Sequence, residues 1–199
     1  MLLRFFKSRL GRVLDSVVYH QRARARTLRL HPLMCSKTPD VPIVIPAYQS
    51  GQVLLNTVES LVRLSDAPII IVNDGSRPDT VPVFDAIANL PRVHVLHHAV
   101  NLGEGAALKT DLNHALVMFP SCTGVVSADA DGQHNPEDIC AVREKLCANP
   151  DVLVLGVRMF DSGVPWRSRV GNQATRVLMN FIVGQKLSDT QTGLRGIPP

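Results

Sequence analysis

The sequence predicts an α/β fold, with helices on both faces of a mostly parallel sheet. From Val41 onward, short runs of β-branched residues alternate with segments whose apolar residues recur at three- and four-residue steps. Strands and helices that alternate in this way form parallel sheets, which bind ligands outside the carboxyl ends of their strands. With 199 residues, of which 45% are hydrophobic and 19% charged, the chain is long enough for one ordinary globular domain.

The predicted elements follow one another in a regular order. Strands are expected at 41–46, 69–72, 92–96, in the run from 125 that ends at two acidic residues, and at 152–157; helices are expected at 52–64, 103–119 and 170–181. A further helix should begin after Asn135, which can cap it, because Pro136, Glu137 and Asp138 are all favourable in a first turn. The residues expected to face the core are Leu54, Val58, Leu61 and Val62, then Leu108, Leu112, Ala115, Leu116 and Phe119, then Ile139, Val142 and Leu146.

Two carboxylates stand where the fourth predicted strand ends. Asp129 and Asp131 are one residue apart, and in an extended chain the side chains at i and i+2 leave the same face. Two neighbouring oxygen ligands suit Mg²⁺ or Mn²⁺, which takes one or two protein carboxylates and fills its other positions with water and substrate phosphate. The pair therefore predicts a site for a metal-bound diphosphate. The alternative is that Asp-x-Asp-Gly is a polar turn that closes the strand.

Composition narrows the class of protein. No apolar stretch approaches the roughly 18 residues that indicate a membrane span. The four cysteines, Cys35, Cys122, Cys140 and Cys147, contain no Cys-x-x-Cys pair. Their scatter favours reduced thiols in a cytosolic setting over a disulfide framework or a zinc site.

The excess positive charge lies at the N-terminus. Residues 1–37 contain nine Lys or Arg and one acidic residue, Asp15, for a net charge of +8, whereas the rest of the chain carries −4. Apolar residues recur between these charges with helical spacing, at Leu3, Phe6, Leu10, Val13 or Leu14, and Val17. This pattern predicts a basic amphipathic helix.

Such a helix can lie in the interface of an anionic membrane, and this is the role we predict for it. A helix packed on the domain and a mitochondrial-type presequence are the open alternatives. Nucleic-acid binding is disfavoured, because few aromatic residues interleave the basic ones and the rest of the chain is acidic. We therefore divide the chain into a basic segment, residues 1–38, which contacts a membrane peripherally through residues 1–30, and a domain at residues 39–199.

Small and polar residues follow three of the predicted strands, at 46–51, 73–76 and 129–131. A dinucleotide-binding fold would place Gly-x-Gly-x-x-Gly after the first strand, where it is absent. The later Gly103-Glu104-Gly105 has Leu108 in place of the third glycine, and no Gly-Lys-Ser or Gly-Lys-Thr of a Walker loop occurs. A bound nucleotide would have to be held by carboxylates and exposed backbone instead.

Five short segments together resemble a known family. They are Val-Ile-Pro-Ala-Tyr at 44–48, Val-Asn-Asp-Gly-Ser at 72–76, Asn-Leu-Gly-Glu-Gly-Ala-Ala-Leu-Lys-Thr at 101–110, Ala-Asp-Ala-Asp-Gly-Gln-His at 128–134 and Ser-Asp-Thr-Gln-Thr-Gly-Leu-Arg-Gly at 188–196. In this order they resemble the family 2 glycosyltransferases, and within them the dolichyl- or polyprenyl-phosphate sugar transferases. The resemblance extends from about residue 41 to the end and implies a nucleotide-diphospho-sugar transferase (GT-A, Rossmann-like) architecture.

The resemblance also implies a donor side for the site. Pro46, Ala47 and Tyr48 would hold the nucleobase, and Asp74 would accept a hydrogen bond from the base or the ribose. Asp129 would contact the ribose or the metal. Asp131 would bind the metal, Mg²⁺ or Mn²⁺, which neutralises the leaving diphosphate.

The last segment should supply the acceptor side. Asp189 occupies the position of a carboxylate base. The second ionisation of a phosphate acceptor lies near pH 6, so such an acceptor is largely an anion already and has less need of a base. Asp189 would therefore orient the acceptor more than deprotonate it. Gln191 is placed in the site by its motif alone. Arg195, Arg167 and Arg169 are candidates for binding phosphate, with a solvated surface charge as the alternative for each. Direct attack opposite the diphosphate would invert the anomeric centre.

The sequence departs from the family pattern in three places. Glu104 stands where many similar sequences have a basic residue, and Asp111 where a small residue is usual, so we assign no phosphate binding to that loop. Similar proteins continue through further strand and helix, and often into membrane anchors, beyond the point where this chain ends. Two interpretations of this end are open. The protein is a truncated or unusually short form, or its acceptor site is completed by a partner.

The expected function is therefore metal-dependent, inverting transfer of a sugar from a nucleotide diphosphate to a polyprenyl-phosphate or glycan acceptor. It would serve cell-envelope or polysaccharide biosynthesis at the cytoplasmic face of the membrane. A sugar-nucleotide-binding pseudoenzyme or partner subunit is the main alternative. A nucleotidyltransferase of related architecture is a weaker one, because residues 47–50 lack the glycine- and arginine-rich loop expected there.

Overall fold

A computed structural model of the chain describes residues 17–20, 41–157 and 192–199, with the backbone alone at 17–20 and Val157. The predicted helix at 170–181 and the predicted N-terminal helix, apart from Val17, lie outside these residues.

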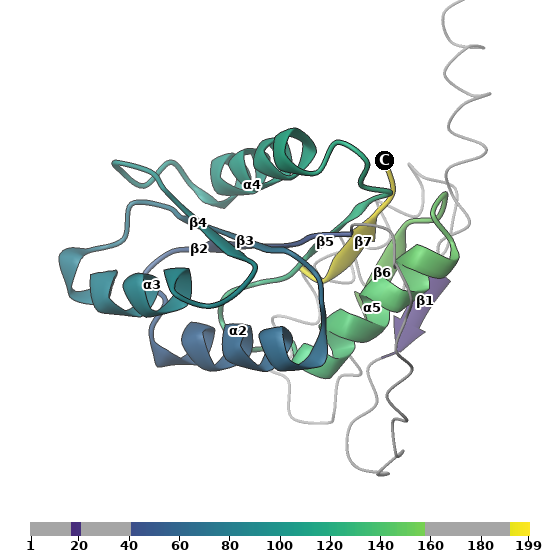
Figure 1. Cartoon of the computed structure of the whole chain (residues 1–199), viewed down its shortest axis with the longest axis horizontal. Helices are drawn as coiled ribbons and strands as arrows, with labels where there is room; N and C mark the ends of the chain where they lie inside the picture. Colours follow the sequence, from purple (N-terminus) through teal and green to yellow (C-terminus); the bar gives the residue numbers. More distant parts are fainter. Residues whose placement is uncertain (1–16, 21–40, 158–191) are drawn as a thin grey trace, which may run out of the picture.

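The described strands form one sheet. They are β1 (Val17–His20), β2 (Ile43–Ala47), β3 (Ile69–Asn73), β4 (Val93–His97), β5 (Val125–Ser127), β6 (Val154–Val157) and β7 (Arg195–Ile197). Their order across the sheet is β1-β6-β7-β5-β2-β3-β4 (Figure 1). β7 is antiparallel to both of its neighbours, and all other neighbouring pairs are parallel. The predicted mostly parallel sheet is thus confirmed.

Helices cover both faces of the sheet (Figure 1). α2 (Gln52–Leu64), α3 (Val81–Ala88) and α5 (Pro136–Ala148) lie on one face, and α4 (Glu104–Met118) lies on the other. A short 3-10 turn, η1 (Pro78–Thr80), leads into α3. In the described part of the chain, no helix combines the length and the apolar character needed to cross a bilayer.

The two faces of the sheet bury two separate sets of side chains. Ile43 and Ile45 of β2 belong to the larger core with α2, α3 and α5, whereas Val44 between them contacts the smaller core under α4. β3 alternates in the same way, with Ile70 toward α4. These side chains are 0% exposed, and burying each one contributes about 2 kcal/mol to stability. Because both faces are covered, these strands read as unbroken β-branched runs.

Three elements of the structure differ from the sequence prediction. α3 was not predicted, because only Phe84 and Ile87 are buried in its eight residues, too few to establish a helical period. β7 was not predicted either, because three residues including a glycine carry no strand signal of their own. Val17 was predicted to end a helix, but it begins the parallel strand β1 instead.

The side of α4 that faces the sheet was also predicted incorrectly in part. Its buried positions are Ala107, Asp111 and Ala115, each one helical turn from the next. Leu116 was predicted to face the core but is 60% exposed, because it follows Ala115 and lies about 100° further around the helix. At the start of α5, Asn135 takes the N-cap position without making the side-chain hydrogen bond to the first turn that a capping asparagine can make.

Candidate functional site

A cavity of about 840 Å³ lies at the carboxyl ends of β2, β3 and β5. The chain order reverses between β2 and β5, since β3 and β4 extend the sheet on one side and β5 on the other. Such reversal points are where open α/β sheets bind ligands. The cavity is lined by Pro46, Ala47, Tyr48, Gln49, Ser50, Gly51, Val53, Asp74, Asn101, Gly103, Glu104, Ala107, Asp129, Ala130, Asp131, Gly193 and Arg195.

The structure brings Asp129 and Asp131 together at this cavity, but not by strand alternation. β5 ends at Ser127, and both aspartates lie in the turn that follows, which Gly132 completes with a φ of +75°. Asp131 is exposed, and its Oδ1 accepts a hydrogen bond from the backbone N–H of Gln133 at 2.9 Å. The turn therefore gives Asp131 a fixed backbone partner while its carboxylate faces the open cavity.

Asp129 is held from two sides. Its Oδ2 lies 3.1 Å from Nε2 of His134, whose side chain is fully buried. On another side is Gly193, where a β-carbon would overlap the Asp129 carboxylate. The hydroxyl of Ser127 donates to the carbonyl of Gly193 at 2.9 Å and keeps this glycine in place. The Asp129 carboxylate can occupy its position only because residue 193 has no side chain.

These two carboxylates fit a divalent metal that also binds a diphosphate. Mg²⁺ and Mn²⁺ take one or two protein carboxylates and complete their coordination with phosphate oxygens and water. Asp129 and Asp131 offer that donor set on the wall of one cavity. Among the described residues, no group of three or more His, Cys, Asp or Glu is arranged to hold a metal without such help.

The loop after β2 forms another part of the cavity wall. Pro46, Ala47 and Tyr48 all line the cavity, and the Tyr48 side chain is 53% exposed there. Gln49 has a φ of +54°, and its backbone N–H donates to the hydroxyl of Ser76 at 2.9 Å. The loop is thereby tied to the turn after β3 and presents an aromatic face on which a base could stack.

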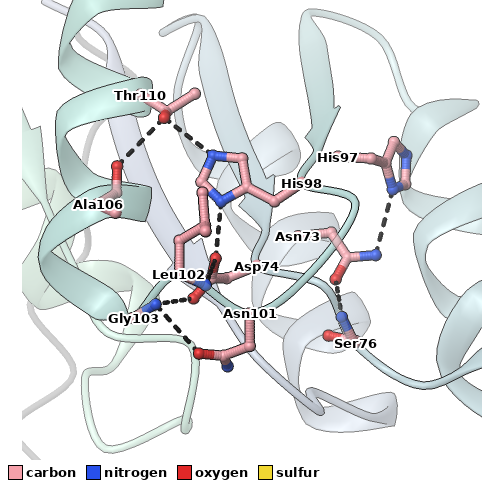
Figure 2. Close-up of polar contacts among 10 residues, drawn as sticks. All are labelled: Asn73, Asp74, Ser76, His97, His98, Asn101, Leu102, Gly103, Ala106 and Thr110. Carbon is pink, nitrogen blue, oxygen red and sulfur yellow. Dashed lines mark hydrogen bonds and ion pairs between the residues drawn. The ribbon is translucent and has the colours of Figure 1, made fainter.

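Asp74 follows β3, and its carboxylate is already bonded to the protein itself (Figure 2). Oδ1 accepts from the Leu102 N–H at 2.9 Å and lies 2.7 Å from Nδ1 of His98, and Oδ2 accepts from the Gly103 N–H at 2.8 Å. Burial raises the pKa of Asp74, but the two backbone amides and the His98 side chain outweigh it and hold the pKa below its ordinary value of 3.8. Asp74 is therefore an ionised acceptor, 2% exposed, and its contact with a base or ribose stays a prediction.

Arg195 lies in the site because β7 is antiparallel. Its partner in β5 is Ser127, so β7 begins at the edge where the parallel strands end. Arg195 Nε donates to the carbonyl of Thr192 at 2.7 Å, and the residue lines the cavity. The other residues predicted on the acceptor side lie outside the described residues: Asp189, Gln191, Arg167 and Arg169.

Comparison with known proteins decides the family. Residues 43–197 match the model for glycosyl transferase family 2. The chain belongs to glycosyltransferase family 2. The family resemblance inferred from the five sequence segments is therefore confirmed.

Relatives in the family include lipid-phosphate sugar transferases. The UDP-N-acetylglucosamine–dolichyl-phosphate N-acetylglucosaminyltransferase of Methanococcus voltae is 29% identical, over 77% of this chain and 67% of that enzyme. The polyprenol monophosphomannose synthase of Mycolicibacterium smegmatis is also 29% identical, over 82% of this chain and 63% of that enzyme. The chain thus spans about two thirds of the length of these relatives.

A solved structure shares the fold. Glucosyl-3-phosphoglycerate synthase from Mycobacterium tuberculosis, in complex with Mn²⁺, UDP and glucosyl-3-phosphoglycerate, superposes with a TM-score of 0.59 at 19% identity. The match covers 80% of this chain and 57% of that one. At this identity the likeness concerns the fold alone, and it confirms the predicted GT-A architecture.

Several residues of this family 2 site were not identified from the sequence. His134 and Gly193 lie within the recognised segments, but their contacts with Asp129 depend on the folded chain. His98 and Thr110 contact the site from behind Asp74. Thr110 is the last residue of the recognised segment 101–110, whereas no local pattern marks His98. The one available signal was Gly193 itself, since a glycine inside a polar motif often marks a close approach of other atoms.

Proposed function

We propose that this chain is a metal-dependent, inverting glycosyltransferase that moves a sugar from a nucleoside diphosphate to a polyprenyl phosphate. The observation that carries the proposal is the shared cavity. Asp129 and Asp131 line it together with the loop after β2, in a member of glycosyltransferase family 2. The names of the two lipid-phosphate relatives support the acceptor class.

On the donor side, the protein would bind and orient a nucleotide sugar. The exposed ring of Tyr48 would stack on the base, and the backbone of Pro46 and Ala47 would contact its edge. Asp129 and Asp131 would hold Mg²⁺ or Mn²⁺ beside the diphosphate. When bound, the metal would supply positive charge to the departing diphosphate.

On the acceptor side, the protein would present an anionic oxygen to the sugar carbon. A phosphate monoester is largely ionised at neutral pH, so the site needs to position it more than to deprotonate it. Arg195 would bind a phosphate through its terminal amino groups, since Nε is already bonded to Thr192. Asp189, Gln191, Arg167 and Arg169 are proposed to complete this side. Attack opposite the diphosphate breaks the bond from the sugar to the nucleotide and inverts the anomeric centre.

We also propose a place for this reaction. Residues 39–199, together with the paired strand β1, would form the catalytic domain, and basic residues within 1–30 would contact the anionic cytoplasmic face of a membrane. Each Lys or Arg near such a surface contributes about 1 kcal/mol. This arrangement would bring the cavity to the level of a lipid-linked phosphate.

A transfer assay tests the function. Purified protein with Mn²⁺ should release nucleoside diphosphate from one of UDP-, GDP- or dTDP-sugars, and a polyprenyl phosphate should increase that release. The product should carry the sugar with the opposite anomeric configuration, as read by NMR. Nucleotide binding without release from any donor, in the presence of lipid phosphate, would favour the sugar-nucleotide-binding pseudoenzyme.

Replacing Gly193 with alanine should destroy the donor site without unfolding the protein. The new methyl group would overlap the carboxylate of Asp129, which would have to leave its position beside His134. We expect the affinity for nucleoside diphosphate with Mn²⁺ to fall by about a hundredfold, which corresponds to the loss of about 3 kcal/mol of metal and phosphate contacts. Isothermal titration calorimetry measures this directly.

Gly105→Ala is the matched control for this change. Gly105 is an exposed residue of α4, and a β-carbon there would meet no atom within 4 Å. It should bind nucleotide like the wild type. Equal affinities for Gly193→Ala and Gly105→Ala would show that Asp129 does not need its present position.

A further inference from the structure

A histidine behind the cavity wall connects two parts of the site. His98 follows β4, and only 12% of its side chain is exposed. Its Nδ1 lies 2.7 Å from Oδ1 of Asp74, and its Nε2 lies 2.9 Å from the hydroxyl of Thr110 in α4 (Figure 2). The ring thus bridges the turn after β3 and the second turn of α4.

The direction of these hydrogen bonds follows from their partners. The Thr110 hydroxyl also lies 3.1 Å from the carbonyl oxygen of Ala106, which can only accept. The hydroxyl of Thr110 donates to that carbonyl and stays in contact with Nε2 of His98. The ionised Asp74 can only accept, so Nδ1 of His98 donates to it. Because Asp74 is ionised, this contact is charge-assisted and stronger than a hydrogen bond between neutral groups.

Asp74 passes this restraint to the start of α4. Its two oxygens accept the N–H groups of Leu102 and Gly103, and Gly103 is the N-cap residue of α4, with a φ of +90°. Gly103, Glu104 and Ala107 then line the cavity. The position of this wall therefore depends on the Asp74 carboxylate.

The turn after β3 and the loop at 98–103 are also in close backbone contact. A β-carbon on Gly75 would overlap the backbone of Val100 and Asn101. Next to it, the side chain of Asn73 accepts the Ser76 N–H at 3.0 Å and lies 3.1 Å from Nδ1 of His97. The turn after β3 therefore contacts the loop at 98–103 at several points.

We propose that His98 and Thr110 are positioning residues for donor binding, which hold the first turn of α4 against the cavity by fixing the Asp74 carboxylate. This inference rests on the proposed function, because the ligand placed by this wall is the nucleotide sugar. Neither side chain lines the cavity, so both act through Asp74 and α4.

Substitutions at His98 separate its two contacts. His98→Ala removes both contacts, His98→Asn retains a donor near the position of Nδ1, and His98→Gln retains an amide near that of Nε2. The control is His114→Ala, since His114 lies on the same helix as Thr110 but further along it, against His94, and does not line the cavity. For Thr110, valine removes the hydroxyl and serine retains it.

The first readout is nucleotide affinity in the full chain. With Mn²⁺ and the nucleoside diphosphate that the wild type binds best among UDP, GDP and dTDP, His98→Ala should raise Kd about tenfold. The KM for the donor should rise equally, while kcat changes less than threefold. His98→Asn should recover most of the affinity and His98→Gln little of it. Thr110→Val should raise Kd two- to threefold, and Thr110→Ser and His114→Ala should match the wild type.

The second readout does not depend on nucleotide. Hydrogen–deuterium exchange of the amides in 98–106 should become at least tenfold faster in His98→Ala, because the acceptor of the Leu102 and Gly103 N–H groups is no longer fixed. In His114→Ala this segment should exchange as in the wild type.

The outcomes distinguish the inference from the function on which it rests. A wild-type protein that binds no nucleoside diphosphate overturns the proposed function and with it the positioning role. Wild-type binding with an unchanged Kd in His98→Ala overturns the positioning role alone. An equal loss in His98→Asn and His98→Ala also overturns it, since the bond to Asp74 would then be unimportant. Unchanged exchange in His98→Ala excludes the connection through Asp74.

Discussion

Replacing Asp131 with asparagine should reduce sugar transfer by about a thousandfold in kcat/KM while the protein stays folded. Asp131 is exposed, so the substitution disturbs no core packing. Its Oδ1 accepts the Gln133 N–H, and the side-chain oxygen of asparagine can accept the same hydrogen bond. The loss is therefore confined to one negative charge on the cavity wall, where the proposed metal binds. Steady-state kinetics with Mn²⁺ measure the change.

A matched carboxylate identifies the cause of this loss. Asp85 is exposed on α3, on the opposite face of the sheet from α4, and does not line the cavity. Asp85→Asn should keep the wild-type rate. In Asp131→Asn, Mn²⁺ should no longer strengthen nucleoside diphosphate binding. If Asp131→Asn retained more than a tenth of the wild-type rate, a metal bound by this residue would play no part in catalysis.

Elements with a repeated local pattern were predictable from the sequence. α2 has the predicted bounds, because Leu54, Val58 and Leu61 repeat at four- and three-residue steps and are all buried. The central strands were predicted because residues buried on both faces form unbroken apolar runs. β7 had no such pattern. It is a strand because it pairs with β5 and β6, which lie about 40 to 70 positions earlier in the chain.

The residues of the candidate site also divide into those that the sequence could predict and those that it could not. The acidic pair Asp129 and Asp131 could be predicted, because two carboxylates one residue apart after an apolar run form a local pattern. The partners of Asp74 could not, since they lie 24 to 29 positions away and include backbone N–H groups that leave no trace in side-chain identity. Gly193 lies 66 positions from Ser127, the residue that holds it. Contacts of this kind are defined only by the order of strands in the sheet.

Asp111 stands where a small residue is expected. Its ionisation should lower the free energy of unfolding as pH rises. It lies on the sheet-facing side of α4 between Ala107 and Ala115, 0% exposed. Neither of its carboxylate oxygens has a hydrogen-bond partner within the described part of the chain. Burial raises the pKa of Asp111 from 3.8 to about 8, so the folded protein keeps this side chain protonated at neutral pH.

The direction of the pH effect follows from proton binding. Between pH 3.8 and about 8 the unfolded chain has released the proton of Asp111 and the folded chain still binds it. The free energy of unfolding therefore falls as pH rises through this window, by about 1.4 kcal/mol per pH unit. Above about pH 8 both states are ionised and the contribution becomes constant.

Asp111→Asn removes this dependence with little change in shape, because asparagine resembles the protonated acid and stays neutral. Its free energy of unfolding relative to the wild type should increase by about 4 kcal/mol between pH 5 and pH 8 and then level off. Urea unfolding at half-unit steps of pH measures the difference, with the exposed Asp85→Asn as the control that should show no such trend. A difference that did not change with pH would mean that Asp111 ionises normally in the folded protein. The ionised carboxylate of Asp111 would then need a hydrogen-bond donor close enough to offset the cost of its burial. Asp111 lies one helical turn from Ala107, which lines the cavity.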